Sequence, residues 1–195
     1  MKKVVIFGLA ANPPHRGHME VAKTLKEYCD EVWLSPCYSH MYDKEMAEPA
    51  HRLNMCQLAV AETPGIKVCP LEIDSRWTLS TYEFMIKLRE LFPDVEFSFC
   101  IGQDNADAID RWKHHEKFIA EFPFLVIPRM SIETANYSWA KADWYKRPPH
   151  KLLSDFGMIG ISSTDIRNNL EAYKKELHPE VYKYIQKMHL YEVHN

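Results

Sequence analysis

Five short apolar runs, rich in β-branched and aromatic residues, recur along the chain. None is longer than 8 residues, and each is almost continuously hydrophobic, which is typical of strands covered on both faces of a parallel sheet. A sixth strand is expected within residues 150–160, where two glycines weaken the pattern. The five runs occupy residues 2–8, 31–36, 66–73, 96–102 and 122–128.

Segments with helical periodicity separate these runs. Each falls between two of the predicted strands, and they cover residues 18–28, 50–62, 80–91 and 104–121. Because strand and helix alternate, we expect right-handed βαβ crossovers and a doubly wound parallel sheet, which is an α/β fold.

The pattern changes in the last third of the chain. Residues 130–149 are polar and aromatic and end in two prolines, so we interpret them as an insertion or lid-like segment. Two short helices are expected after it, at 163–175 and 179–188. A length of 195 residues suits one well-buried core better than two. We therefore expect one domain over 1–195, with a core at 1–160 and a small C-terminal helical extension at 161–195.

The composition is that of an ordinary globular protein. Apolar residues make up 46% of the chain and charged residues 26%, and the formal net charge is −3. This balance gives no global attraction to nucleic acid or to an anionic membrane, so neither is expected as a partner. Any polyanion that the protein handles must be met by a local pocket of donors.

Cysteine usage and hydropathy bear on location. The cysteines are odd in number and form no C-x-x-C pair, so we interpret them as thiols in a reducing compartment; they are Cys29, Cys37, Cys56, Cys69 and Cys100. No apolar run approaches the ~20 residues that span a bilayer, and the N-terminus lacks the pattern of a signal peptide. These features predict a cytoplasmic protein.

The stretch NPPHRGH, residues 12–18, connects the first predicted strand to the first predicted helix. Ligands of parallel α/β sheets collect at such turns, and a helix N-terminus attracts phosphate. Gly8 and Gly17 let the backbone turn tightly and lie close to a ligand. His15 and His18 would direct two ring N–H donors to the same place, so the turn is a candidate phosphate site.

Two other interpretations of this histidine pair stay open at this point. The two residues could be ordinary polar residues near a helix start. They could also be the first ligands of a zinc site, because His-x-x-His can bind zinc. Further ligands at a suitable spacing are missing, so no metal site is predicted.

A second candidate lies in ISSTDIR, residues 161–167. Ser162 and Asp165 have the S/T-x-x-D/E spacing of a capping box, which predicts a helix start. The hydroxyls of Ser162 and Ser163, backbone N–H groups and the Arg167 guanidinium would together form an anion receptor. The alternative is a plain capped surface helix with an incidental arginine.

Taken together, NPPHRGH and ISSTDIR resemble the H-x-G-H and ISSTxIR signatures of the nicotinamide/nicotinate mononucleotide adenylyltransferases, within the nucleotidyltransferase α/β superfamily. The two motifs stand in the family's order near opposite ends of the chain. The resemblance continues through DKEMAEPAHRLNMCQLAV, RWTLSTYEFMIKL, CIGQDNADAIDRW and HPEVYKYIQKMHLY. It spans nearly the whole chain and implies the Rossmann-like fold of that superfamily.

The resemblance implies transfer of AMP from ATP to the 5′-phosphate of nicotinamide or nicotinate mononucleotide, with release of pyrophosphate. Catalysis would consist of alignment and charge stabilisation at the α-phosphorus, without a general base. His15 and His18 would hold the ATP phosphates, and Arg167, Ser162 and Ser163 would grip the departing β- and γ-phosphates. Mg²⁺ would be held mainly by the ATP phosphates, since no carboxylate cage is evident.

The remaining binding residues follow from the same match to the family. They are Gly102 and Asp104 for the adenosine ribose, Lys44 for a phosphate, and Trp77, Thr81 and Trp112 for the pyridine ring and its surroundings. Arg52 and the tail LYEVHN, residues 190–195, are interpreted as structural.

One departure from the family concerns the first turn. Where the family usually has Gly-Ser/Thr-Phe before Asn/Asp-Pro, this chain has Leu9, Ala10 and Ala11. The change removes a hydroxyl and an aromatic ring from the turn. Nucleotide affinity or ring specificity is expected to be altered, while the histidines preserve catalysis.

Several alternatives stay open in the sequence. One is a sister nucleotidyltransferase acting on phosphopantetheine or a phospho-alcohol, and another is a non-catalytic nucleotide-binding sensor. The preference between the nicotinamide and the nicotinate form is undetermined. The oligomeric state is undetermined as well, and a homo-oligomer is allowed.

Overall fold

The computed structural model describes residues 1–39, 45–128, 143–153 and 160–192. Its centre is a six-stranded sheet of order β3-β2-β1-β4-β5-β6, in which all neighbouring strands are parallel. The predicted doubly wound α/β sheet is therefore confirmed. The strands are β1 (Lys2–Leu9), β2 (Glu31–Pro36), β3 (Ile66–Val68), β4 (Val95–Gly102), β5 (Phe124–Ile127) and β6 (Lys151–Leu152).

This strand order places a switch point between β1 and β4. The chain moves outward from β1 to β2 and β3, returns to β4 on the other side of β1, and then moves outward to β5 and β6. In such sheets a crevice opens outside the carboxyl ends of the two strands that flank the switch point. Leu9 and Gly102, the last residues of β1 and β4, therefore border the place where a ligand is expected.

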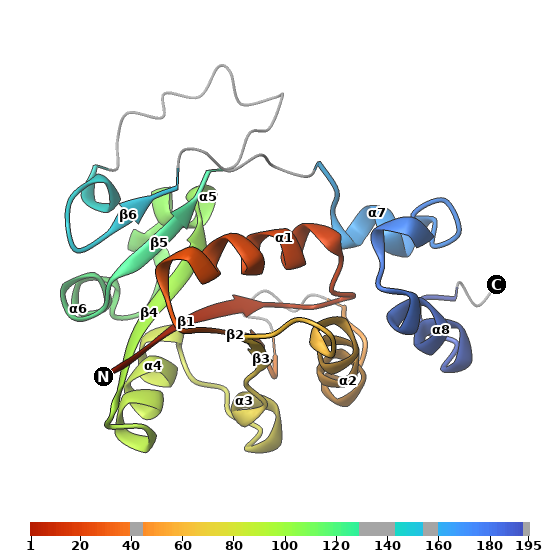
Figure 1. Cartoon of the computed structure of the whole chain (residues 1–195), viewed down its shortest axis with the longest axis horizontal. Coiled ribbons are helices and arrows are strands. Elements are labelled where there is room, and N and C mark those ends of the chain that lie inside the picture. Colours follow the sequence, from red (N-terminus) through yellow and green to blue (C-terminus); the bar gives the residue numbers. More distant parts are fainter. Residues whose placement is uncertain (40–44, 129–142, 154–159, 193–195) are drawn as a thin grey trace.

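Helices cover both faces of the sheet. α1 (Arg16–Leu25) packs on one face, and α4 (Thr81–Leu91) and α6 (His115–Glu121) pack on the other. Figure 1 shows α1 and α4 on opposite sides of the strands. Val5 of β1 belongs to the α1 side, Val4 and Ile6 belong to the other, and all three are at most 1% exposed. Burial on both faces explains why β1 is hydrophobic without alternation.

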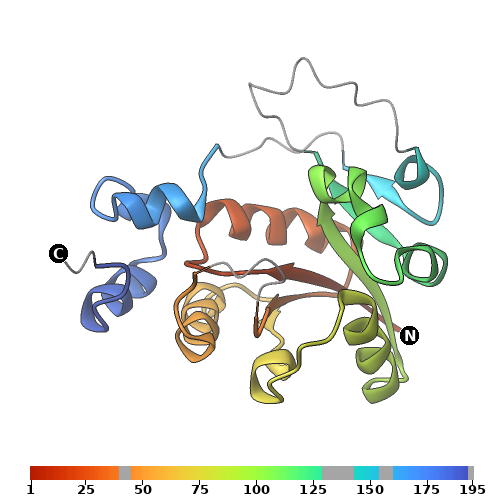
Figure 2. The same ribbon diagram turned by 180° about the vertical axis from the view of Figure 1, so that it is seen from behind.

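The C-terminal helices dock against one end of this core. α7 (Ser163–Asn168) and α8 (Pro179–Lys187) form a third apolar cluster with α2 (Pro49–Val60). The contacts are made by Met55 of α2, Ile166 of α7, and Val181 and Ile185 of α8, each of them fully buried. Figures 1 and 2 both show α7 beside the start of α1. Segments from the two ends of the chain thus meet at the carboxyl edge of the sheet.

Two predicted elements are shorter than expected. The strand predicted at 66–73 ends at Val68, because Pro70 has no N–H for the ladder, and a helical turn, α3 (Leu71–Asp74), follows. The first predicted C-terminal helix ends at Asn168 instead of 175. The side chain of Asn169 accepts the N–H of Ala172 at 3.1 Å and so forms a turn before η5 (Lys174–Glu176).

The single helix predicted at 104–121 is wrong. The segment is divided into α5 (Gln103–Asp107), η2 (Ile109–Arg111) and α6, and His114 has a left-handed backbone with φ 62°. Trp112 and Phe118 would lie on different sides of a continuous helix. In the broken arrangement both rings pack against Phe99, with centroid distances of 6.3 and 5.4 Å.

The remaining described elements are short. They are η1 (Lys26–Tyr28) after α1 and η4 (Trp144–Lys146) before β6. Most of the predicted insertion at 130–149 lies outside the described residues, whereas the sixth predicted strand is present as β6. Helices in the described ranges reach 12 residues at most, against the ~20 of a membrane span, and none of them could cross a bilayer.

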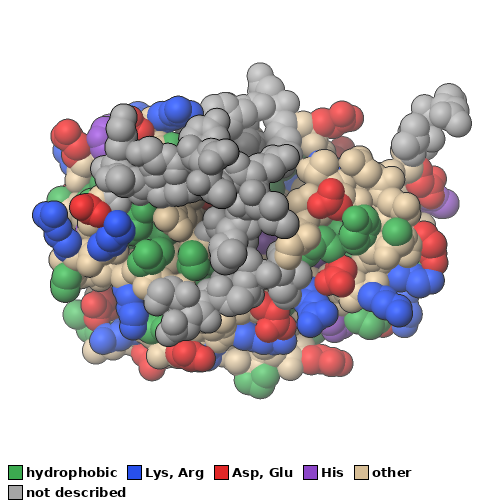
Figure 3. Space-filling model, turned by 90° about the horizontal axis from the view of Figure 1, so that it is seen from above, with side chains coloured by type: hydrophobic (Ala, Val, Ile, Leu, Met, Phe, Trp, Pro, Cys, Tyr) green, Lys and Arg blue, Asp and Glu red, His purple; other side chains and the backbone are tan. Residues whose placement is uncertain are grey.

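The described surface carries charges of both signs. On the face seen in Figure 3, acidic and basic side chains are intermingled. Neighbouring turns of a helix pair opposite charges, as between Lys87 and Glu90 or Lys183 and Glu180, each at 2.7 Å. A polyanionic substrate is therefore more readily met by a pocket of donors than by this face.

Candidate active site

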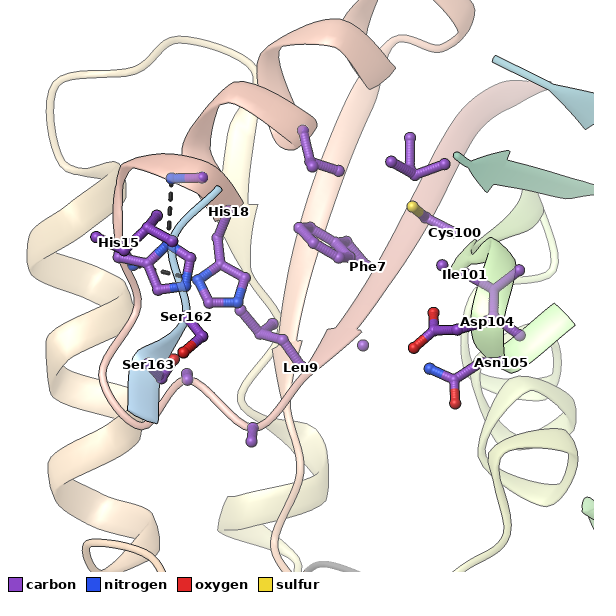
Figure 4. Close-up of a pocket in the computed structure, with 18 of the residues that line it drawn as sticks. Phe7, Leu9, His15, His18, Cys100, Ile101, Asp104, Asn105, Ser162 and Ser163 are labelled. Atoms are coloured by element: carbon purple, nitrogen blue, oxygen red, sulfur yellow. Dashed lines mark hydrogen bonds between the residues drawn. The ribbon is translucent and has the colours of Figure 1, made fainter. Parts of the chain in front are cut away.

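A cavity of about 510 Å³ lies at the carboxyl ends of β1 and β4, at the switch point of the sheet. This volume falls within the usual range of small-molecule sites. In Figure 4, His15, His18, Ser162 and Ser163 lie on one side, Asp104 and Asn105 lie opposite, and Phe7 and Leu9 lie between them. The lining includes nine predicted site residues: Gly8, His15, Gly17, His18, Gly102, Asp104, Trp112, Ser162 and Ser163.

The start of α1 fixes both histidines as N–H donors. Nδ1 of His15 accepts the N–H of Gly17 at 3.1 Å, and Nδ1 of His18 accepts the N–H of His15 at 3.2 Å. Because Nδ1 is the acceptor in both rings, Nε2 carries the proton of each neutral ring. The ring centroids are 3.8 Å apart. The helix start therefore presents two adjacent Nε2–H donors on one wall of the cavity.

Burial keeps this histidine pair neutral. Burial lowers the pKa of His15 to about 4, although nearby Asp165 acts in the opposite direction. Burial and the neighbouring His15 lower the pKa of His18 well below its ordinary value. At neutral pH the free protein thus offers an incoming phosphate two hydrogen-bond donors rather than two cations.

If the protein acts on ATP as the family resemblance implies, Gly17→Ala is expected to lower kcat/KM for ATP by about tenfold, since a small misplacement of a group that contacts the substrate costs that much or more. A Cβ at Gly17 would lie 3.0 Å from two atoms of the His15 ring and 3.6 Å from Cγ2 of Ile161, so the ring would have to move. Steady-state kinetics measure the effect. Gly160→Ala is the matched control, because a Cβ there meets no described atom within 4 Å. Equal activity of the two variants would contradict the role assigned to this close approach.

The capping box predicted in ISSTDIR is formed at the start of α7. Oγ of Ser162 accepts the N–H of Asp165 at 3.1 Å, and the Asp165 carboxylate accepts the N–H of Ser162 at 3.1 Å. The Ser163 hydroxyl donates to the carbonyl oxygen of Pro13 at 2.9 Å. These bonds begin α7 directly against the first turn, with both serines at the cavity.

Arg167 links the two motifs, which are far apart in the sequence. Its Nη1 donates to the carbonyl oxygen of Asn12 at 2.8 Å, across 155 positions of the chain, and its Nη2 donates to Oγ1 of Thr164 at 3.2 Å. Arg167 does not line the cavity that the described residues form. Its predicted contact with the β- and γ-phosphates stays a prediction.

Arg52 anchors the phosphate turn, which comprises residues 9–15. This side chain is fully buried, and its donors reach four backbone carbonyl oxygens at 2.7–2.9 Å. Within the turn, Ala11 has a left-handed backbone with φ 53°. The guanidinium thus fixes the turn without facing the ligand, which agrees with the structural role expected of it. The four acceptors belong to Ala10, Cys37, Tyr38 and Ala47.

The opposite wall is formed at the start of α5. A Cβ at Gly102 would lie 2.7 Å from Oδ1 of Asp104, so the absence of a side chain at Gly102 makes room for this carboxylate. The Tyr145 hydroxyl donates to Oδ1 of Asp107 at 2.8 Å and anchors the same helix. Asn105 also lines the cavity and was missed in the sequence, although it directly follows the G-x-D match.

Of the four predicted contacts of the mononucleotide, two lie away from the cavity and one lies outside the described residues. Trp77 and Thr81, both within the described residues, are not part of the cavity lining. Trp77 packs against Phe84, with ring centroids 6.4 Å apart, and Thr81 is the first residue of α4. Lys44 lies outside the described residues. The ligand contacts of these three residues stay predictions.

The strand order is that of a Rossmann-like α/β fold, and the cavity lies at the switch point of the sheet, where such folds bind their ligands. The family model described as cytidylyltransferase-like matches residues 6–169. The chain belongs to this cytidylyltransferase-like family, and the resemblance drawn from NPPHRGH and ISSTDIR is confirmed.

Individual relatives narrow the comparison. A protein of Bacillus mycoides (strain KBAB4), named "Probable nicotinate-nucleotide adenylyltransferase", is 29% identical over 200 residues, covering 98% of this chain and 100% of that protein. A protein of the same name from Bacteroides fragilis (strain YCH46) is 32% identical over 190 residues, covering 94% and 90%. The structure of "Plasmodium falciparum nicotinic acid mononucleotide adenylyltransferase complexed with NaAD" matches with a TM-score of 0.79 and 25% identity, covering 98% of both chains.

Proposed function

We propose that the protein transfers AMP from ATP to nicotinate mononucleotide, forming deamido-NAD and pyrophosphate. The observation that carries this proposal is the single cavity in which His15 and His18 lie together with Ser162 and Ser163. The nicotinate form of the substrate is supported by the names of the relatives and by the NaAD complex of the Plasmodium falciparum enzyme.

The reaction needs alignment and neutralisation of charge. A phosphate oxygen of the mononucleotide attacks the α-phosphorus of ATP, a new P–O bond forms, and the bond to the β-phosphate oxygen breaks. The electron pair of that bond leaves with pyrophosphate. We assign the Nε2–H groups of His18 and His15 to the α-phosphate and its neighbours, where they stabilise developing negative charge.

The departing pyrophosphate is assigned to the ISSTDIR wall. Ser162 and Ser163 line the cavity, and Arg167 is one helical turn further along α7. In this proposal Arg167 holds α7 against the phosphate turn and contributes positive charge to the β- and γ-phosphates. Asp104 binds the adenosine ribose on the opposite wall, and Trp112 lines the cavity as an aromatic face for the pyridine ring.

Magnesium is assigned to the substrate rather than to the protein. Among the described residues, no three His, Cys, Asp or Glu side chains come together to hold a metal ion. These residues do not fit a protein cage for magnesium. We propose that Mg²⁺ is bound by phosphate oxygens of ATP, which is its usual arrangement with nucleotides.

We also propose that residues 1–195 act as one nucleotidyltransferase domain in the cytoplasm. The participation of α7 in the cavity supports a single functional unit, because the C-terminal extension supplies part of the site. All five cysteines are free thiols, which supports a reducing compartment.

A substrate panel tests the proposal. The purified protein is given ATP, Mg²⁺ and, in separate reactions, nicotinate mononucleotide, nicotinamide mononucleotide or phosphopantetheine. Pyrophosphate release and a new dinucleotide are expected with the pyridine substrates, faster with the nicotinate form. The proposal fails if neither mononucleotide gives product. Binding of ATP in calorimetry without pyrophosphate release would favour a non-catalytic sensor instead.

A further inference from the structure

The C-terminal tail reaches the phosphate turn. The hydroxyl of Tyr191 donates to Oδ1 of Asn12 at 2.9 Å, across 179 positions of the chain. Asn12 is 1% exposed, and burial raises the pKa of Tyr191, so the hydroxyl keeps its proton and acts as a donor. The sequence suggested only a structural role for this tail, but the bond ends in the turn that carries the active-site histidines.

Asn12 is the point where four segments meet. Its Oδ1 accepts from Tyr191 and also from the N–H of Ala47 at 3.0 Å, and its Nδ2 donates to the carbonyl oxygen of Glu45 at 3.5 Å. Its own carbonyl oxygen accepts from Arg167 at 2.8 Å. One buried asparagine therefore joins the phosphate turn to α7, to the segment before α2 and to the tail after α8.

The conformation of the tail indicates that this contact is specific. Tyr191 has a left-handed backbone, with φ 67°, which is unfavourable for a residue with a large side chain. The ring packs against the cluster formed by α2, α7 and α8, and this packing directs the hydroxyl toward Asn12. Without that hydroxyl, the N–H of Ala47 would be the one hydrogen-bond donor left to the buried Oδ1 of Asn12 within the described residues.

We propose that Tyr191 is a positioning residue of adenylyl transfer. Acting through Asn12, it holds the phosphate turn so that His15 and His18 meet the ATP phosphates in a fixed geometry. This inference rests on the proposed function for its kinetic consequence. It gives Tyr191 of the C-terminal tail a role in the active site, although Tyr191 lies outside both phosphate motifs.

Tyr184 provides the matched control. Its hydroxyl makes one partly buried contact, with Nδ1 of His51 at 2.8 Å. This contact joins α8 to α2 and does not reach the phosphate turn. Tyr191→Phe and Tyr184→Phe each remove one hydroxyl and keep the ring. The two variants should therefore lose similar stability, and only the first should change the active site.

Kinetics give the first readout. Tyr191→Phe is expected to lower kcat/KM for ATP about fivefold, which corresponds to about 1 kcal/mol, the worth of one such hydrogen bond. Tyr184→Phe is expected to stay within about twofold of the parent protein. Equal values for the two variants would overturn the proposal.

A double-mutant cycle shows whether the hydroxyl acts through Asn12. If it does, Tyr191→Phe has no further effect on kcat/KM in an Asn12→Ala background. A second full loss of about fivefold in that background would mean that the tyrosine acts elsewhere, and the proposal would be wrong.

Imidazole nitrogen spectra of the ligand-free protein give a readout that needs no turnover. The ¹⁵N shifts of His15 and His18 are expected to change in Tyr191→Phe and to stay unchanged in Tyr184→Phe. Unchanged shifts in both variants would overturn the positioning role. This result is separate from the proposed function, which instead fails when the unsubstituted protein forms no dinucleotide from either pyridine substrate.

Discussion

Replacing His18 with alanine is expected to lower kcat for dinucleotide formation by about a hundredfold, which corresponds to ~3 kcal/mol of lost transition-state stabilisation. The Nε2–H of His18 is a fixed donor, because its Nδ1 is occupied by the N–H of His15 at 3.2 Å. Its ring also lies 3.8 Å from that of His15, so the two donors act at one place. Pyrophosphate release under saturating ATP and nicotinate mononucleotide measures the effect.

Two further variants test whether the hydrogen-bond donor of His18 accounts for the loss of kcat. His18→Gln keeps an amide N–H at a similar reach, so its loss of kcat should be clearly smaller than that of alanine. His189→Ala removes an exposed histidine that contacts Glu192 at 2.9 Å, and it should leave kcat unchanged. A rate for His18→Ala within about threefold of the parent would show that the charge is stabilised by another group.

Arg52→Met is expected to lower the free energy of unfolding by at least about 3 kcal/mol. Arg52 is fully buried, and its guanidinium satisfies four backbone carbonyl oxygens that the methionine side chain would leave without this donor. One of these carbonyls belongs to Ala10 in the phosphate turn, so kcat/KM for ATP should fall as well. Urea unfolding followed by circular dichroism measures the change in stability.

Arg89→Met is the control for loss of an arginine. Arg89 is about half exposed, pairs with Glu121 at 2.7 Å and lies over the ring of Phe122. Its replacement should cost less than about 1 kcal/mol, as is usual for a surface ion pair. The loss of stability of Arg52→Lys should lie between those of Arg52→Met and Arg89→Met, because an ammonium group cannot donate to several carbonyls in the fork geometry of a guanidinium. Similar unfolding midpoints for Arg52→Met and Arg89→Met would contradict the bracing role of Arg52.

Most of the sheet could be predicted because its signals are local. The five predicted strands begin within two residues of the observed positions, and the capping box at Ser162 forms as its spacing requires. Both signals can be read from neighbouring residues: a continuous apolar run for a strand, and one side chain that reaches an N–H group three positions away for the helix cap. The resemblance to nucleotidyltransferases rested on equally local motifs, and the family match confirms it.

Other features could not be predicted because they depend on contacts between distant segments. The helix break after Asp107 lets Trp112 and Phe118 pack against the same ring, that of Phe99. Phe99 belongs to β4, so this contact could not be read from the helical pattern of residues 104–121. Trp77 has the spacing of the family motif, yet in the structure it packs against Phe84 outside the cavity. Asn12 was part of the first motif, but no role was predicted for its side chain, since its partners lie as far away as residue 191.

The sequence by itself determined the strand and helix alternation, the two phosphate motifs and the family to which they point. Only the tertiary structure decided that His15, His18, Ser162 and Ser163 share one cavity, that Arg167 binds the first turn, and that Tyr191 binds Asn12. The physical reason is that hydrophobic periodicity and capping are properties of adjacent residues. Which distant segments touch is decided when all the apolar faces of the chain are buried together.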